Sequence, residues 1–129
     1  MKLLGKGEHR FPPVDKSERY IILDDYTKPI IEEQLSGTIM SLSGHTTDSI
    51  GLLLEDGSLF CGDAAMNSFP SLNRITIWIE NLEDYRRSWE VMLNLEPSMI
   101  YPSHGKPFKK EDLKKNMHKL GELKLYPLK

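Results

Sequence analysis

Two histidines and an aspartate are the residues of this chain whose types and positions fit a metal site. His45, Asp63 and His104 each stand beside a glycine, in a chain that has four histidines and one cysteine. Imidazole and carboxylate groups are ligands that zinc, iron and manganese accept. Glycine lets loop backbones approach each other closely, as they must around an ion. Taken singly, such a histidine is also typical of a turn and such an aspartate of a helix cap, so the metal hypothesis depends on whether the fold brings the three together.

The residues next to these three are candidates for positioning them. Thr46 and Thr47 follow the first histidine and could supply hydrogen bonds that orient its imidazole ring. Gly62 and Ser103 directly precede the aspartate and the second histidine. We therefore include Thr46, Gly62 and Ser103 in the candidate site as supporting residues.

A β-hairpin is the clearest local prediction of the sequence. Two apolar runs, residues 49–55 and 58–63, flank the dipeptide Asp56-Gly57. This dipeptide tolerates the positive φ that a tight hairpin turn requires. A hairpin folds its strands antiparallel, so the loop that enters the first strand and the loop that leaves the second lie at the same end of the sheet. His45 and Asp63 are therefore expected to be neighbours.

Upstream of the hairpin the patterns are shorter. Residues 37–43 predict a further strand, and a short β-branched run at 20–23 predicts another that leads into a turn. Residues 1–19 are polar, contain a Pro-Pro pair and show no sustained period, so we interpret them as an irregular leader arm. The rest of the chain, residues 20–129, is then the folded domain.

Downstream of the hairpin the apolar pattern changes to a helical period. An apolar stripe at spacings of three and four follows Asn81, a residue suited to capping a helix, and ends before Pro97. Residues 98–102 predict a short strand and residues 109–123 a final helix. Between the hairpin and the first helix, residues 66–80 read as a loop followed by an apolar run of ambiguous type.

This order of elements predicts an α/β fold with one mixed β-sheet layer covered by helices. A helix joins the strand that ends at Gly62 to the strand at 98–102, which favours a parallel crossover within one sheet. Asp63 and His104 then follow the carboxyl ends of neighbouring strands. All three candidate residues converge on one edge, where open α/β sheets usually bind their ligands.

Composition narrows the classes of function. The chain has 129 residues, a formal net charge of −2, one cysteine and no apolar run long enough to span a membrane. One domain is expected, with no nucleic-acid partner and no membrane partner. With a single cysteine nothing indicates an oxidising compartment, so the cytoplasm is the expected location.

The motifs also resemble those of a known family. The segment LSGHTTDSIGLLLEDGSLFCGDAAMN and the later IYPSHGKPF are similar to the GHT loop, hairpin, GD and closing HG elements of metallo-β-lactamase-fold hydrolases. The resemblance covers roughly residues 37–120 and implies half of the family's αββα sandwich. It implies that His45 binds a first metal, His104 a second, and that Asp63 bridges the two and is the catalytic residue. The implied cofactor is zinc, or iron or manganese.

One element of that family is missing from this sequence. Its HxHxDH motif, expected well before the GHT loop, does not occur, and only His9 precedes His45. The chain therefore resembles the carboxy-terminal half of the fold, with His9 and His118 as substitute ligands to consider. A sheet that normally packs on a partner sheet also exposes an apolar patch. We expect a homodimer to cover it, with a separately encoded amino-terminal half, or residues 1–19, as alternatives.

Two functions follow from these observations. The first is a metal-dependent hydrolase that activates water to cleave an ester, thioester, amide or phosphoester, truncated and lacking full activity alone. The second is a non-catalytic oligomeric or binding domain that retains a vestigial half of the metal site.

Overall fold

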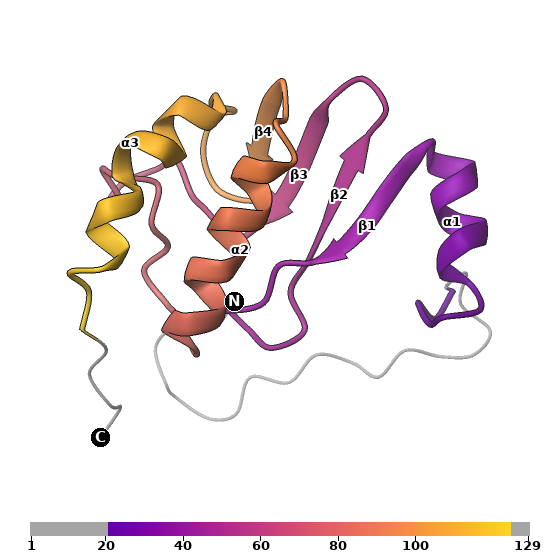
Figure 1. The fold of residues 1–129 in the computed structure, drawn as a ribbon, viewed down its shortest axis with the longest axis horizontal. Helices are drawn as coiled ribbons and strands as arrows, with labels where there is room; N and C mark the ends of the chain where they lie inside the picture. Colours follow the sequence, from indigo (N-terminus) through magenta and orange to yellow (C-terminus); the bar gives the residue numbers. More distant parts are fainter. Residues whose placement is uncertain (1–20, 125–129) are drawn as a thin grey trace, which may run out of the picture.

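The computed structural model describes residues 21–124, which form an α/β fold of one four-stranded sheet and three helices (Figure 1). The predicted leader arm, with His9, lies outside the described residues. In chain order the elements are α1 (Lys28–Leu35), β1 (Gly37–Ser41), β2 (Ile50–Leu54), β3 (Ser58–Gly62), α2 (Leu82–Asn94), β4 (Met99–Pro102) and α3 (Lys110–Leu120).

The sheet is mixed and has the strand order β1-β2-β3-β4. The first three strands are antiparallel neighbours, and β2 and β3 form the predicted hairpin around Asp56-Gly57. β4 pairs with β3 in parallel after the crossover through α2, as the sequence predicts. The loop before β2 and the loops after β3 and β4 therefore meet at one edge of the sheet.

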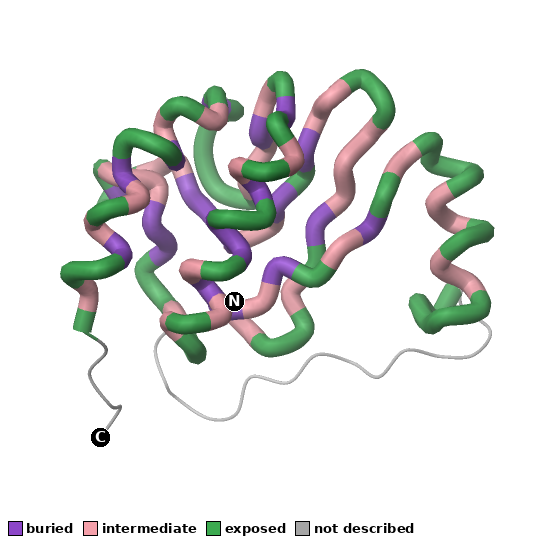
Figure 2. Tube along the Cα trace, viewed as in Figure 1, coloured by how far each residue is buried: buried purple, intermediate pink, exposed green. Residues whose placement is uncertain are grey.

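α2 and α3 cover one face of the sheet and enclose the core (Figures 1 and 2). Leu59 and Ile100 point from the strands into this core and are fully buried. Tyr85 and Trp89 of α2 and Leu113 of α3 close it from the helix side, each with no exposed surface. Asn81 caps α2 as predicted, its side chain accepting a hydrogen bond of 2.9 Å from the Asp84 main-chain N–H.

The segment before β1 differs from the prediction. Residues 21–23 form no strand. Ile21 is 64% exposed and Ile22 is 67% exposed. The expected turn instead contains α1, which starts with a proline in its first turn and stands beside β1. Without a neighbouring strand to pair with, β-branched residues gain nothing from an extended conformation.

None of the helices in residues 21–124 is both long and apolar enough to cross a membrane.

Candidate metal site

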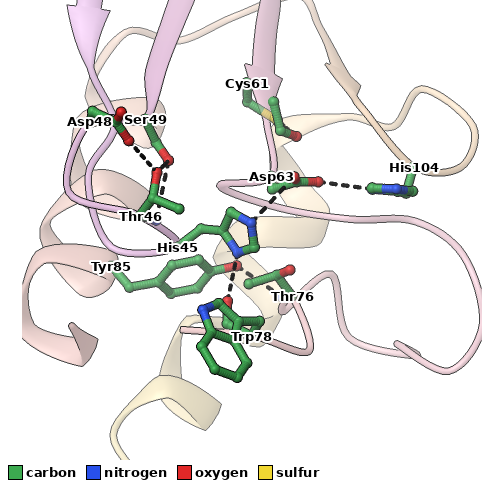
Figure 3. A network of polar contacts seen from close by, with 11 residues as sticks. His45, Thr46, Asp48, Ser49, Cys61, Asp63, Thr76, Trp78, Tyr85 and His104 are labelled. Carbon is green, nitrogen blue, oxygen red and sulfur yellow. Dashed lines mark hydrogen bonds and ion pairs between the residues drawn. The ribbon is translucent and has the colours of Figure 1, made fainter. Parts of the chain in front are cut away.

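The structure brings His45, Asp63 and His104 together at the predicted edge of the sheet (Figure 3). Asp63 lies between the two histidines. Its Oδ1 is 2.8 Å from His104 Nδ1, and its Oδ2 is 3.3 Å from His45 Nε2. Each carboxylate oxygen thus faces a different imidazole ring, an arrangement suited to a carboxylate that bridges two cations.

The loop that carries His45 is fixed to the start of α2. The carbonyl of Gly44 accepts hydrogen bonds from the main-chain N–H groups of Glu80 and Asn81, at 2.8 and 3.0 Å. The hydroxyl of Ser88 donates to the carbonyl of Ser43 at 2.6 Å. Gly44 has a φ of +136°, and a Cβ atom there would overlap the backbone of Tyr85. Only glycine allows the loop to lie this close to the helix.

Asp63 is positioned by an irregularity at the end of β3. The register with β4 shifts between Phe60 and Gly62, and Gly62 adopts a left-handed conformation with φ of +57°. This bulge directs the next side chain along the edge of the sheet. The indole Nε1–H of Trp89 donates to the carbonyl of Ala64 at 2.8 Å, which fixes the turn that follows Asp63 to the buried face of α2.

His104 is held by main-chain contacts on both sides. The N–H of Ser103 donates to the carbonyl of Gly62 at 3.0 Å, tying the ends of β3 and β4 together. The carbonyl of His104 accepts from the N–H of Asn67 at 2.8 Å. Gly105 follows with a φ of +96°, and a Cβ there would overlap the backbone of Asn67. The side chain of His104 is 63% exposed, whereas those of His45 and Asp63 are 22% and 28% exposed.

A main-chain carbonyl that the sequence analysis did not identify orients His45. The carbonyl oxygen of Trp78 lies 2.7 Å from His45 Nδ1. A carbonyl can only accept, so Nδ1 carries the proton and Nε2 presents its lone pair toward Asp63 when the ring is neutral. The loop before Trp78 is anchored in turn, because the buried N–H of Thr76 donates to the hydroxyl of Tyr85 at 3.0 Å.

The three supporting residues predicted from the sequence, Thr46, Gly62 and Ser103, lie at the site. They differ from one another in the contacts that they make. The hydroxyl of Thr46 donates to Asp48 Oδ1 at 2.8 Å and lies 2.7 Å from the hydroxyl of Ser49, so it stabilises the loop around His45. Gly62 and Ser103 act through the main-chain bond that joins the two strand ends. His118, considered as a substitute ligand, is an exposed residue in the last turn of α3.

Cys61 lies two residues before Asp63 and belongs to the core rather than to the site. Its side chain is fully buried. Burial raises the pKa of this thiol to about 12, so the group is protonated at neutral pH. Because a metal binds the thiolate form, the structure gives Cys61 no role as a ligand.

The donor types fit a metal, but the number of donors falls short. His45 and His104 each leave one ring nitrogen with a lone pair, and Asp63 offers two oxygens. Within residues 21–124, however, no group of three or more His, Cys, Asp and Glu side chains is arranged to hold an ion by itself. A catalytic zinc commonly has three protein ligands and a water. The described residues thus offer donor types that suit a metal, in a number too small to hold one alone.

Comparisons with known proteins show which proteins this chain is similar to in sequence and in structure. No family model matches the chain. In sequence, 67 residues are 36% identical to the "Beta-lactamase-like protein 2 homolog" of Drosophila melanogaster, a match covering 52% of this chain and 21% of that protein. In structure, the chain is similar to a metallo-β-lactamase from Erythrobacter litoralis, with a TM-score of 0.60 and 19% identity over 81% of this chain and 49% of that one.

Over part of its extent, the chain has the fold of a metallo-β-lactamase. A metallo-β-lactamase superfamily protein of Sulfolobus tokodaii shares the fold as well, with a TM-score of 0.56 and 19% identity over 72% of this chain and 36% of that protein. The chain spans about a fifth of the length of the curated relative that it matches and between about a third and a half of these two solved structures. The metallo-β-lactamase fold is therefore shared over part of its extent, as one sheet layer with its helices.

Proposed function

We propose that this chain contributes His45, Asp63 and His104 to the metal centre of a hydrolase. The observation that carries the proposal is Asp63, whose two oxygens face the imidazole rings of two different histidines. A zinc, iron or manganese ion bound there would activate water for attack on an ester, thioester, amide or phosphoester. The similarity in fold to a metallo-β-lactamase supports this chemistry.

In this proposal His45, Asp63 and His104 have different roles. His45 presents Nε2 because the Trp78 carbonyl occupies Nδ1. Asp63 is the proposed catalytic residue, since its two oxygens could serve two ions. His104, the most exposed of the three, would hold the second ion. With two protein donors to each ion, counting Asp63 for both, the described residues alone would bind metal weakly.

We infer that the chain corresponds to the carboxy-terminal half of the metallo-β-lactamase fold. The order of its elements supports this, because the GHT loop, the hairpin, the GD turn and the HG loop follow one another in residues 44–105. We also propose a reducing location such as the cytoplasm, on the ground of its single, buried cysteine.

Metal binding tests the proposal directly. Full-length protein purified without chelator is analysed for zinc, iron and manganese, and its zinc affinity is measured by competition with a chromophoric chelator. We expect Asp63→Ala to lower the affinity by at least about 100-fold, because it removes a donor shared by both ions. The matched control is Asp25→Ala, which removes an exposed carboxylate elsewhere. Equal zinc affinity in wild type and Asp63→Ala would overturn the assignment.

A non-catalytic binding or oligomerisation domain is the second candidate. The observation in its favour is the shortfall of donors within residues 21–124, together with the exposed apolar residues Ile50 and Phe60 on the strands β2 and β3. This alternative predicts less than about a tenth of an equivalent of metal in purified protein and micromolar or weaker zinc affinity that the two substitutions above leave unchanged.

A further inference from the structure

Asn67 joins the loop that follows Asp63 to the loop that carries His104. It forms a parallel β-bridge with Gly105, outside the four strands of the sheet. The main-chain N–H of Asn67 donates to the carbonyl of His104 at 2.8 Å, and its side-chain Nδ2 donates to the carbonyl of Lys106 at 2.9 Å. One residue thus holds the main chain on both sides of Gly105, beside the candidate site.

The bond from the side chain is the one that depends on the residue type. Every residue except proline can donate its main-chain N–H, so the bond to the carbonyl of His104 does not require asparagine. The bond to the carbonyl of Lys106 requires a side-chain donor, and the two residues are 39 positions apart in sequence. A carbonyl only accepts, so it is the amide Nδ2 of Asn67 that faces it.

Asn67 is itself anchored to the core. The three residues between Asp63 and Asn67 are buried. The carbonyl of Ala64 accepts from the buried indole of Trp89 at 2.8 Å. The N–H of Met66 donates to a main-chain carbonyl later in the same loop at 3.0 Å. The core therefore holds Asn67 in place, and Asn67 holds the loop of His104.

The side chain of His104 is oriented by hydrogen bonding more than by packing. It is 63% exposed, and its Nδ1 lies 2.8 Å from Oδ1 of Asp63 (Figure 3). An ionised carboxylate only accepts, so Nδ1 carries the proton and Nε2 has the lone pair when the ring is neutral. A loop displacement of about 1 Å would end this contact, because a separation beyond about 3.5 Å is no longer a hydrogen bond.

We propose that Asn67 is the positioning residue of His104. Its side-chain amide fixes the loop so that Nδ1 of His104 stays within hydrogen-bond distance of Asp63 and Nε2 is the nitrogen left available. Asn67 acts through the main chain of the loop. The positioning rests on these hydrogen bonds alone, and its value to a hydrolase rests on the proposed function.

An isosteric substitution isolates the contact. Asn67→Asp keeps the size of the side chain but replaces the donating NH2 group by an oxygen, which cannot bond the carbonyl of Lys106. Asn73→Asp is the matched control in the same loop. Asn73 accepts through Oδ1 from the N–H of Ile75 at 3.1 Å, and aspartate retains that acceptor. Asn67→Ala removes the amide without adding a charge.

The tautomer of His104 is the readout, measured in long-range ¹H–¹⁵N correlation spectra of the metal-free full-length protein. Spectra are recorded at about pH 8.5, above the ordinary titration range of imidazole. We expect the ratio of Nδ1–H to Nε2–H to fall at least about fivefold in both Asn67 variants, because Nδ1 loses its fixed acceptor. Asn73→Asp is expected to keep the wild-type ratio, and exposed His118 is the internal reference.

A destabilised variant separates positioning from overall stability. Met92 is fully buried in the last turn of α2, whereas the first turn of that helix holds the loop of His45. Met92→Ala lowers the free energy of unfolding by leaving a cavity in the core. We expect it to keep the wild-type tautomer ratio at His104. Circular dichroism and urea unfolding establish that each variant is folded.

A lowered ratio confined to the two Asn67 variants supports the proposal. A wild-type ratio in both folded Asn67 variants overturns it, and so does a ratio that falls equally in Met92→Ala. Wild-type protein gives a second test, in which the side-chain NH2 of Asn67 should exchange with solvent at least about threefold more slowly than that of exposed Asn94. Equal rates would also overturn the proposal. The zinc affinity of Asp63→Ala tests the proposed function separately, so that either can fail while the other stands.

Discussion

The main-chain carbonyl of Trp78 lies 2.7 Å from Nδ1 of His45, although the two residues are 33 positions apart in sequence. This contact decides which ring nitrogen of His45 faces Asp63. It links the ring to a loop that the buried hydroxyl of Tyr85 holds in place. The orientation of His45 thus depends on the interior of α2.

His45 is expected to carry its proton on Nδ1 when the ring is neutral. The Trp78 carbonyl and the Asp63 carboxylate both only accept, and the carbonyl is the nearer of the two, 2.7 Å from Nδ1 against 3.3 Å from Nε2 to Oδ2, so a single ring proton satisfies the shorter contact. Long-range ¹H–¹⁵N correlation spectra of metal-free protein distinguish the two tautomers, and exposed His118 is the internal reference. A dominant Nε2–H tautomer for His45 would contradict the geometry.

Tyr85→Phe is expected to destabilise the fold by about 1–3 kcal/mol, because the buried N–H of Thr76 loses its acceptor. The free energy of unfolding in urea measures the effect. Tyr26→Phe is the control, since Tyr26 is 82% exposed, and its stability should match that of wild type. We also expect weaker zinc binding in Tyr85→Phe, because the loop that orients His45 becomes looser.

Gly105→Ala is expected to cost more stability than Gly62→Ala. Both glycines have positive φ, and an alanine in that region costs about 1–2 kcal/mol. At Gly62 the nearest atoms to an added Cβ are 3.8 and 3.9 Å away, so backbone strain is the only penalty. At Gly105 the added Cβ also overlaps the backbone of Asn67 and displaces the loop of His104. Equal urea midpoints for the two variants would contradict this account.

Much of the fold and of the site could be predicted because strong local signals fixed the topology. Asp56-Gly57 specified the hairpin, and the helical period after Asn81 specified the crossover to β4. These two connections suffice to place His45, Asp63 and His104 at one edge. The carbonyl of Trp78 could not be predicted, since every residue has a carbonyl and an irregular loop carries no periodic signal to place it.

The strand predicted at residues 20–23 was wrong for a related reason, since residues 21–23 form no strand. The run at 20–23 has the composition of a strand, but a strand forms only beside a neighbour, and the composition of a run cannot supply one. α1 has eight residues and none of them is buried, so an apolar stripe was too weak to indicate it. The helix depends instead on contacts with β1 that sequence reasoning did not anticipate.

The contact between α1 and β1 is expected to weaken in acid. Glu32 Oε2 accepts hydrogen bonds from Lys28 Nζ at 2.9 Å and from the N–H of Ile39 in β1 at 2.7 Å. The bond from Lys28, followed by the bond from Ile39, lowers the pKa of Glu32 below its ordinary value of 4.5. A lowered pKa in the folded state means that the contribution to stability is present above about pH 4.5 and is lost as the pH falls through the folded-state value.

Substitution of Glu32 tests this pH dependence. Glu32→Gln removes the charge, so we expect its urea midpoint to fall less than that of wild type between pH 7 and pH 3.5. Glu33→Gln, one position along the same helix, is the matched control and should follow wild type. Because Glu32 protects the main-chain N–H of an edge strand, faster amide exchange at Ile39 at pH 7 is expected in Glu32→Ala, which removes the acceptor. An Ile39 amide that exchanges at the wild-type rate in Glu32→Ala would show that Glu32 does not hold α1 against β1.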